Sequence, residues 1–85
     1  MYYYTNHIMN ICVRYFASIK DDMGMGTVNI QVDDDITAGN LFDQLTSEIQ
    51  YNGTVLIAVN HEYVDCSYKL KDGDEVAYFP PVTGG

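Results

Sequence analysis

Residues 72–85 read DGDEVAYFPPVTGG and contain, in succession, a turn, a strand and a strand stop. Asp72-Gly73-Asp74 consists of residues that favour tight turns. In Glu75–Phe79 the residues alternate between two faces, which is the period of a β-strand. Proline has no backbone N–H to donate to a neighbouring strand, so Pro80-Pro81 ends the strand and directs the chain into an extended course. The stretch predicts a last strand with a stiff exit.

The residues after the exit form a thin tail, Val82-Thr83-Gly84-Gly85. Glycine lacks a Cβ and allows close approach of the backbone to another surface, so Gly84-Gly85 can enter a slot too narrow for other residues. The carboxylate of Gly85 is then the candidate reactive group. The alternative interpretation is a frayed terminus, since terminal residues are often poorly ordered.

Upstream of this stretch, the sequence predicts a helix and two further strands. Thr37 is a suitable N-cap for a helix running to about Gln50. Its apolar stripe recurs every four residues and is expected to face the core; it comprises Leu41, Leu45 and Ile49, widened by Phe42. The apolar run Val55–Val59 is typical of a central strand buried on both faces, and Tyr63-Val64 of a brief strand.

The opening of the chain predicts two strands joined by a short helical turn. From Ile11 to Phe16 the residues alternate, with Ile11, Val13 and Tyr15 on one face and Cys12, Arg14 and Phe16 on the other. Residues 17–22 are expected to form the helical turn, which Gly24 and Gly26 end. Thr27–Val32 alternates again and predicts the second strand.

The order strand, strand, helix, strand, short strand, strand predicts an α+β fold, the ubiquitin-like β-grasp: a mixed sheet with one main helix across one face. In this arrangement the first and last strands are neighbours. We expect residues 9–79 to form the domain and residues 80–85 a flexible Gly-Gly tail. Residues 1–8 are interpreted as an N-terminal extension, either non-native or from an upstream start at Met1.

Composition restricts the partners. A chain of 85 residues forms one domain, and its net charge of −8 repels phosphate backbones, which argues against nucleic acid and favours a basic protein partner, although solubility alone explains such a charge equally well. No apolar run reaches the length of a membrane span and no signal sequence opens the chain. We therefore expect a cytoplasmic protein without membrane contact.

No metal or cofactor site is expected in this chain. Cys12 and Cys66 are too few and too far apart for a zinc or iron–sulfur site and are interpreted as reduced, structural thiols. His7 and His61 have no partner at metal-ligand spacing. Asp33-Asp34-Asp35 lacks the further oxygen ligands and the glycine of a calcium loop.

Four segments resemble the small subunit of molybdopterin synthase, a ubiquitin-like sulfur carrier: Val13–Ala17, Ala58–Asn60, Asp72–Ala77 and above all Phe79–Gly85. The resemblance implies that an ATP-using, ubiquitin-activating-like adenylyltransferase adenylates the Gly85 carboxylate, and that sulfur then replaces the adenylate to give a thiocarboxylate. It further implies a heterotetramer with the large synthase subunit. There the sulfur attacks the cyclic pterin precursor and builds the dithiolene that holds molybdenum.

The resemblance also assigns roles to the site residues. Gly85 carries the reacting group, and Pro80, Pro81, Val82, Thr83 and Gly84 insert into the large subunit. Activation precedes sulfur loading because a carboxylate is a poor electrophile, whereas its anhydride with AMP has a good leaving group. We expect no independent catalysis by this chain: the catalytic acids and bases belong to the partners, and ATP to the activating enzyme.

A docking surface is expected near the start of the tail. Phe16 and Phe79 fall on the strand faces opposite their core neighbours, and Tyr63 follows a turn. For each residue alone, ordinary packing beneath the helix or the N-terminal extension is an equal alternative. Together they predict an exposed apolar surface that binds both the activating enzyme and the large subunit.

Two alternatives remain open from the sequence. A sulfur carrier for thiamine synthesis or tRNA thiolation shares the Gly-Gly ending but matches the Phe-Pro-Pro element less well. A non-covalent β-grasp interaction module, whose tail is never activated, belongs to a different class.

Overall fold

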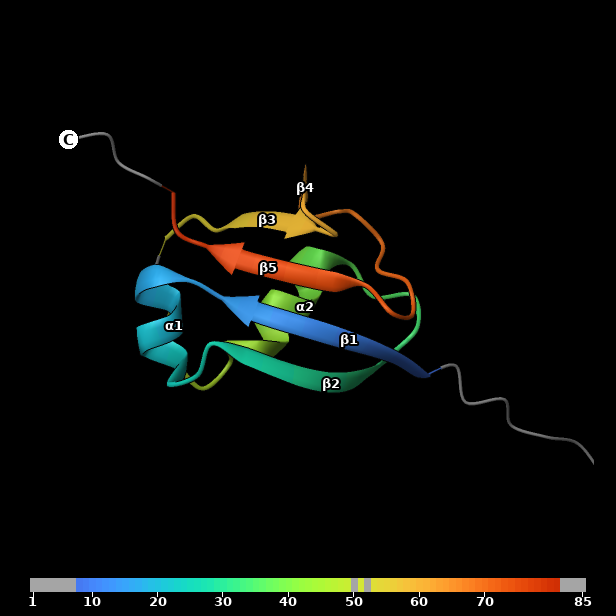
Figure 1. The fold of residues 1–85 in the computed structure, drawn as a ribbon, viewed down its shortest axis with the longest axis horizontal. Coiled ribbons are helices and arrows are strands. Elements are labelled where there is room, and N and C mark those ends of the chain that lie inside the picture. Colours follow the sequence, from blue (N-terminus) through green and yellow to red (C-terminus); the bar gives the residue numbers. More distant parts are fainter. Residues whose placement is uncertain (1–7, 50, 52, 82–85) are drawn as a thin grey trace, which may run out of the picture.

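The computed structural model describes residues 8–49, 51 and 53–81 and shows a five-stranded sheet with two helices (Figure 1). The strand order across the sheet is β2-β1-β5-β3-β4. In chain order the elements are β1 (Ile8–Tyr15), α1 (Ala17–Met23), β2 (Thr27–Asp33), α2 (Ala38–Leu45), β3 (Leu56–Val59), β4 (Glu62–Val64) and β5 (Glu75–Phe79). This is the β-grasp arrangement that the sequence predicted.

The first and last strands are neighbours, as predicted. β1 and β5 run parallel, with Cys12 opposite Glu75 and Tyr15 opposite Tyr78, whereas the other neighbouring strands are antiparallel. β1 begins at Ile8, three residues before the alternation that starts at Ile11, because Ile8 pairs with Asp33 of β2. β5 has the predicted bounds, since the turn at Gly73 and the stop at Pro80 delimit it.

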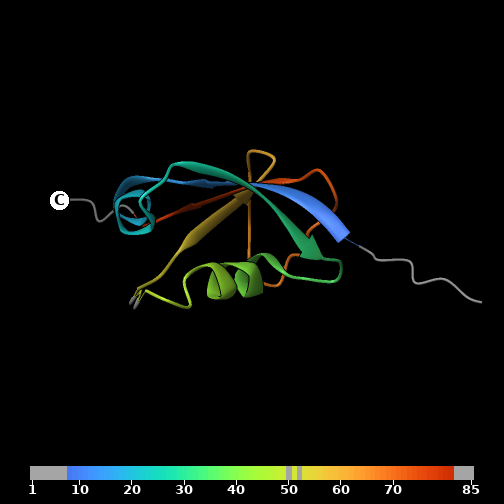
Figure 2. The same cartoon turned by 90° about the horizontal axis from the view of Figure 1, so that it is seen from below.

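Helix α2 crosses one face of the sheet and encloses the core there (Figure 2). One face of each alternating strand is buried: Ile11, Val13 and Tyr15 in β1, and Val76 and Tyr78 in β5. From the predicted helical stripe, Leu41 and Phe42 are buried, and Leu45 and Ile49 are half-buried. The Tyr78 hydroxyl donates a 2.6 Å hydrogen bond to the Ala38 carbonyl, and burial raises its pKa. No helix of the described residues lies across the opposite face of the sheet (Figure 2), and we call this face the open face.

Helix α2 is shorter than predicted. Thr37 caps it as expected, because its Oγ1 accepts a 3.1 Å hydrogen bond from the Asn40 N–H. The helix ends at Leu45, whereas the prediction extended it to Gln50, a residue outside the described part of the chain. At this end the Thr46 hydroxyl and the Thr46 N–H both donate to the Phe42 carbonyl, at 2.8 Å and 3.0 Å. After Thr46 the backbone bonds change to the i−3 carbonyl, from Ser47 to Gln44 at 3.4 Å and from Ile49 to Thr46 at 3.1 Å, so the chain continues in tighter turns.

Strand β3 corrects a second prediction. It lies beside the edge strand β4, and its residues alternate between half-buried and buried, so it is not a strand buried on both faces. Leu56 and Ala58 lie on the open face, where no helix covers them. The run is apolar because its residues on the open face, Leu56 and Ala58, are also apolar, although they are only half-buried.

The turns at one end of the sheet are tied together by the Asp74 carboxylate, which is buried. It accepts hydrogen bonds from the Lys71 N–H at 2.8 Å and the Asn60 side chain at 3.0 Å. Asn60 and His61, both with positive φ, form the tight turn from β3 to β4. Within the described residues, no helix is long and apolar enough to span a bilayer.

Candidate functional site

The candidate site begins where β5 ends. Phe79 is the last residue of β5, Pro80 is half-buried beside it, and Pro81 is exposed. The predicted insertion residues Val82, Thr83 and Gly84, and the predicted reactive residue Gly85, lie outside the described residues. The structure therefore describes the base of the tail and the surface around it.

The three predicted docking residues, Phe16, Tyr63 and Phe79, lie together on the open face, and we call them the aromatic triplet. The ring centroids of Phe16 and Phe79 are 5.9 Å apart at 89°, and those of Tyr63 and Phe79 are 5.7 Å apart at 61°. Tyr63 is 73% exposed, Phe16 is 39% exposed and Phe79 is half-buried. Phe79 thus links two exposed rings into one apolar surface.

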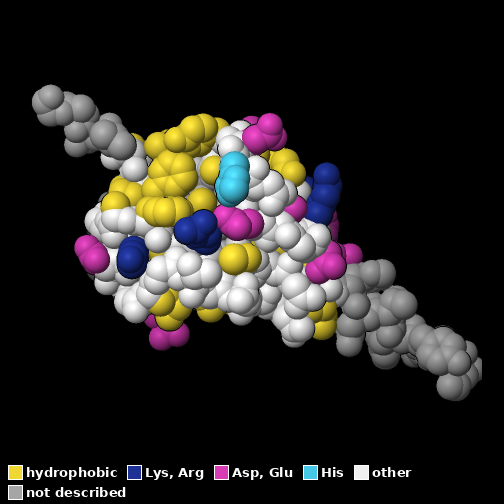
Figure 3. All heavy atoms as spheres, in the orientation of Figure 1, with side chains coloured by type: hydrophobic (Ala, Val, Ile, Leu, Met, Phe, Trp, Pro, Cys, Tyr) yellow, Lys and Arg dark blue, Asp and Glu magenta, His cyan; other side chains and the backbone are white. Residues whose placement is uncertain are grey.

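The strand register explains this grouping. Because β1 and β5 are parallel and adjacent, the residues at their carboxyl ends, Phe16 and Phe79, meet at one end of the sheet. Tyr63 lies opposite Ala58, and Ala58 lies opposite Ala77. These two small side chains leave space above the sheet, so the Tyr63 ring reaches across to Phe79. Hydrophobic side chains gather on this face next to the exit of the chain (Figure 3).

A cluster of charged side chains borders the triplet. The Arg14 guanidinium carbon lies 5.4 Å from the centroid of the Phe16 ring, a cation–π distance. Arg14 also contacts the Glu75 carboxylate at 3.4 Å, and His61 contacts the same carboxylate at 3.5 Å. An exposed ion pair such as Arg14–Glu75 contributes little to stability. These side chains give the apolar surface a polar border, as at protein interfaces.

The sequence predicts the triplet but not this border. The alternation of residues 11–16 predicted that Arg14 lies on the same strand face as Phe16. The neighbours Glu75 and His61 depend on strand pairing and on the turn after β3, which no local pattern specifies.

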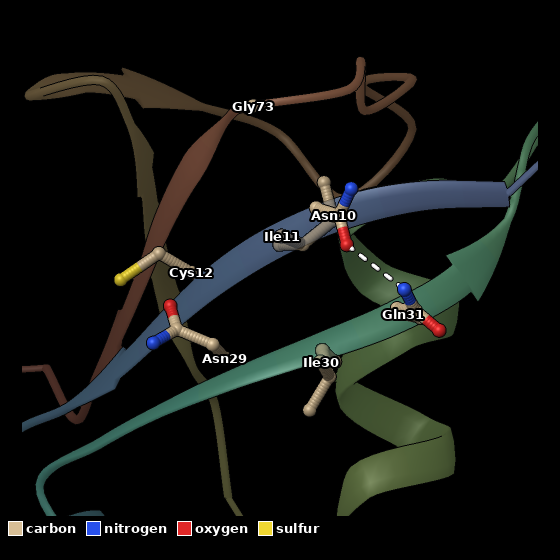
Figure 4. A pocket seen from close by; sticks show the side chains of 7 residues that line it. All are labelled: Asn10, Ile11, Cys12, Asn29, Ile30, Gln31 and Gly73. Atoms are coloured by element: carbon tan, nitrogen blue, oxygen red, sulfur yellow. Dashed lines mark hydrogen bonds between the residues drawn. The ribbon is translucent and has the colours of Figure 1, made fainter.

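A shallow depression of about 490 Å³ lies elsewhere on the sheet, over the middle of β1 and β2. Its lining includes Asn10, Cys12, Asn29 and Gln31, and the Gln31 side chain donates to Asn10 at 3.2 Å (Figure 4). It contains none of the predicted site residues, and its polar amides suit hydrogen bonding rather than acid–base chemistry.

The cysteines differ in their surroundings. Both are free thiols; Cys12 is half-buried in this depression, and Cys66 is exposed. Cys66 lies in the loop that packs against the start of α2, where its carbonyl accepts a 2.9 Å bond from the Gly39 N–H. His7 lies outside the described residues. Among the residues that are described, no group of three His, Cys, Asp or Glu side chains has the arrangement of a metal site.

The acidic loop after β2 is engaged in an ion pair. Asp35 contacts the Lys69 ammonium at 2.6 Å. This hydrogen bond and the charge of Lys69 lower the pKa of Asp35, and the same contact raises the pKa of Lys69. The ion pair connects the end of β2 to the segment before β5.

Comparison with known proteins places this geometry among small carrier and modifier proteins. Residues 13–85 match the ThiS family. The molybdopterin synthase sulfur carrier subunits of Escherichia coli and Haemophilus influenzae are 35% and 32% identical, over 88% and 86% of this chain and 99% and 96% of theirs. Small archaeal modifier protein 3 of Haloferax volcanii is 33% identical over 91% of this chain and all of its own.

Solved structures agree with the sequence relatives. A Haloferax volcanii protein determined in solution superposes with a TM-score of 0.80 at 27% identity, covering 100% of this chain and 94% of the other. Subunits 1 and 2 of the molybdopterin-converting factor from Helicobacter pylori form a complex; the matching chain has a TM-score of 0.64 and 31% identity, with 91% of this chain and 100% of that chain covered.

Proposed function

The chain belongs to the ThiS family, and on this premise we propose that it is the sulfur-carrier subunit of a molybdopterin synthase, with Gly85 as the group that carries sulfur. The observation that carries the proposal is the position of the aromatic triplet directly beside Pro80, where the chain leaves the sheet. A docking surface at the base of a narrow tail suits a protein that presents its end to other enzymes.

The first proposed step is activation of Gly85. A carboxylate oxygen attacks the α-phosphorus of ATP bound by a partner adenylyltransferase, pyrophosphate leaves, and an acyl adenylate forms. Hydrosulfide then attacks the carbonyl carbon, the bond to AMP breaks and AMP leaves, and the C-terminal thiocarboxylate forms. The tail contributes shape: Gly84 and Gly85 have no side chains to obstruct a narrow active site, and Pro80-Pro81 restricts the directions in which the tail can extend.

The second proposed step is sulfur transfer on a large subunit. The complex of subunits 1 and 2 from Helicobacter pylori supports such a partner. The thiocarboxylate sulfur there attacks a carbon of the cyclic pterin precursor and displaces an oxygen substituent. Water then hydrolyses the resulting thioester, which leaves the sulfur on the pterin and restores the Gly85 carboxylate. Two such transfers supply the two sulfurs of the dithiolene. The aromatic triplet supplies the apolar contact area, and Arg14 and Glu75 supply charge complementarity at its border. We propose no metal or cofactor held by this chain; ATP is a substrate of the partner.

Intact-mass measurement tests the carrier function. The protein is co-expressed with an adenylyltransferase that loads a known carrier, and the expected result is replacement of one oxygen by sulfur at Gly85. The matched control lacks Gly85 and is expected to keep its original mass. If the wild-type chain stays unmodified while the known carrier is loaded in the same cells, the proposal is wrong.

A second candidate function is protein modification, which the similarity to small archaeal modifier protein 3 favours. The acyl adenylate of Gly85 is then attacked by a lysine amine instead of sulfur, AMP leaves, and an amide bond forms. Digestion and mass spectrometry of the same cells distinguish the two: modification predicts lysine-linked C-terminal fragments of this chain on other proteins, and sulfur carriage predicts a thiocarboxylate.

A further inference from the structure

The two edges of the sheet differ in length. β4, at one edge, has 3 residues, and short edge strands limit pairing with other chains. β2, at the other edge, has 7 residues and pairs with β1 in an unbroken register from Ile8–Asp33 to Arg14–Thr27. Its sequence TVNIQVD contains no lysine, proline or bulge, which are the usual devices that prevent edge pairing. Among the described residues, no strand pairs with the outer edge of β2, so this edge is free to pair.

The backbone groups of β2 that face outward can be assigned. The Tyr15 N–H donates to the Gly26 carbonyl at 2.9 Å, so the groups of Gly26 face β1. Residues of an antiparallel strand alternate in the direction of their backbone groups. The outward-facing N–H and C=O groups accordingly belong to Thr27, Asn29, Gln31 and Asp33.

The sequence of β2 reads almost the same in both directions around Ile30: Val28-Asn29-Ile30-Gln31-Val32. Two identical strands that pair across a two-fold axis must be complementary to themselves, with each residue facing its counterpart. We propose that β2 binds β2 of a second copy of this chain, antiparallel and centred on Ile30. All the outward-facing backbone groups then find partners in one continuous sheet.

The side chains on the open face match in this register. Asn29 lies opposite Gln31 of the second copy, and an amide pair of this type already exists within the chain, where Gln31 donates to Asn10 at 3.2 Å (Figure 4). Thr27 lies opposite Asp33 of the second copy, so a hydroxyl donor faces a carboxylate. Cross-strand pairs of these kinds stabilise antiparallel sheets.

The side chains on the core side also match. Val28 lies opposite Val32 of the second copy, and the two Ile30 residues meet at the axis. All three are half-buried and pack against the core, so they still expose apolar surface along the edge. Pairing removes part of this surface from water, which favours association.

Charge opposes the association. Each copy carries −8, and repulsion between like-charged proteins is screened by salt. We therefore expect a weak dimer that tightens as ionic strength rises. β1 separates β2 from β5, so pairing at β2 leaves the aromatic triplet and Pro80 accessible. The dimer is compatible with docking to other enzymes.

A pair of double variants tests the register by sedimentation equilibrium. N29K/Q31E places opposite charges across the axis at both symmetry-related positions, whereas N29K/Q31K places like charges there. We expect the first to dimerise roughly 10- to 100-fold more tightly than the second. Because N29K/Q31K has the smaller net negative charge, general repulsion predicts the opposite order. Equal dimerisation, or that opposite order, would overturn the proposal.

A proline variant provides an independent test. The Asn29 N–H faces outward, so Asn29→Pro removes a donor that β1 does not use, while Asn29→Thr keeps it. We expect Asn29→Pro to sediment as a monomer and Asn29→Thr as the wild type, with increasing salt favouring the wild-type dimer. A wild-type chain that stays monomeric at millimolar concentration and high salt contradicts the proposal. So does a dimer that Tyr63→Asp abolishes and Asn29→Pro does not.

Discussion

The two faces of β5 have different roles although their residues alternate within one strand. Val76 and Tyr78 are fully buried in the core. Ala77 and Phe79 lie on the open face, where Phe79 is part of the aromatic triplet. One face stabilises the domain and the other presents a surface beside the tail. Recognition and stability can therefore be separated by single substitutions one residue apart.

The largest effect on stability is expected from Tyr78→Ala. The change removes a fully buried ring that contacts Tyr15 and Phe42, and it leaves a cavity. Substitutions of this type cost about 3–5 kcal/mol. Urea denaturation measures the loss. Tyr78→Phe, which removes only the hydroxyl bond to Ala38, is the matched control, with an expected loss of about 1–3 kcal/mol. Equal losses for the two variants would place the stabilisation in the hydroxyl rather than the ring.

Thr37→Ala is expected to have an intermediate effect. Its hydroxyl caps α2 through the Asn40 N–H, and loss of an N-cap costs about 1 kcal/mol. Because α2 lies on the core face, partner binding by the folded protein should be unchanged. Thermal unfolding and calorimetric titration with the large subunit measure the two quantities. Weaker binding at full stability would show that the core face also contributes to recognition.

Arg14→Gln changes the polar border of the aromatic triplet. It should lower stability less than Thr37→Ala does. It removes an exposed contact with Glu75 and the cation over Phe16, so the expected loss is below about 1 kcal/mol. The difference from wild type should shrink at high salt because the charges are exposed. Denaturation at low and high salt measures it, and a loss independent of salt would indicate packing of the side-chain stem instead.

The smallest effect is expected for the ion pair between Asp35 and Lys69, both fully exposed. The pKa of Asp35 is lowered below 3.8, so its contribution is present above that pH and is lost as pH falls through the folded-state value. The pKa of Lys69 is raised above 10.5, so its contribution is present below that pH and is lost as pH rises through the folded-state value.

Unfolding midpoints of wild type and Asp35→Asn measure this contribution. They should differ slightly near neutral pH and converge at low pH, where Asp35 is protonated. A difference that persists at the lowest pH would contradict the assignment to this carboxylate.

Local signals predicted much of the fold. Gly73 and Pro80 bracket β5, and its bounds were predicted correctly for that reason. The end of α2 was not, because the apolar stripe continues to Ile49 while the backbone after Thr46 changes to hydrogen bonds with the i−3 carbonyl, which the stripe does not reveal. The grouping of Phe16 with Phe79 follows from parallel pairing of the first and last strands, which the element order implied. The position of Glu75 between Arg14 and His61 could not be predicted, because it depends on the register in which β5 pairs with β1 and β3.

The most direct test of the central claim measures binding of the large subunit by Tyr63→Asp and Phe79→Asp. Ser47→Asp, exposed at the end of α2, adds the same charge and is the control. If the open face is the docking surface, both triplet variants lose about 2 kcal/mol or more of binding free energy, roughly a 30-fold weaker Kd, while Tyr63→Asp keeps its Tm and Ser47→Asp binds normally. Unchanged affinity of the folded triplet variants would contradict the claim.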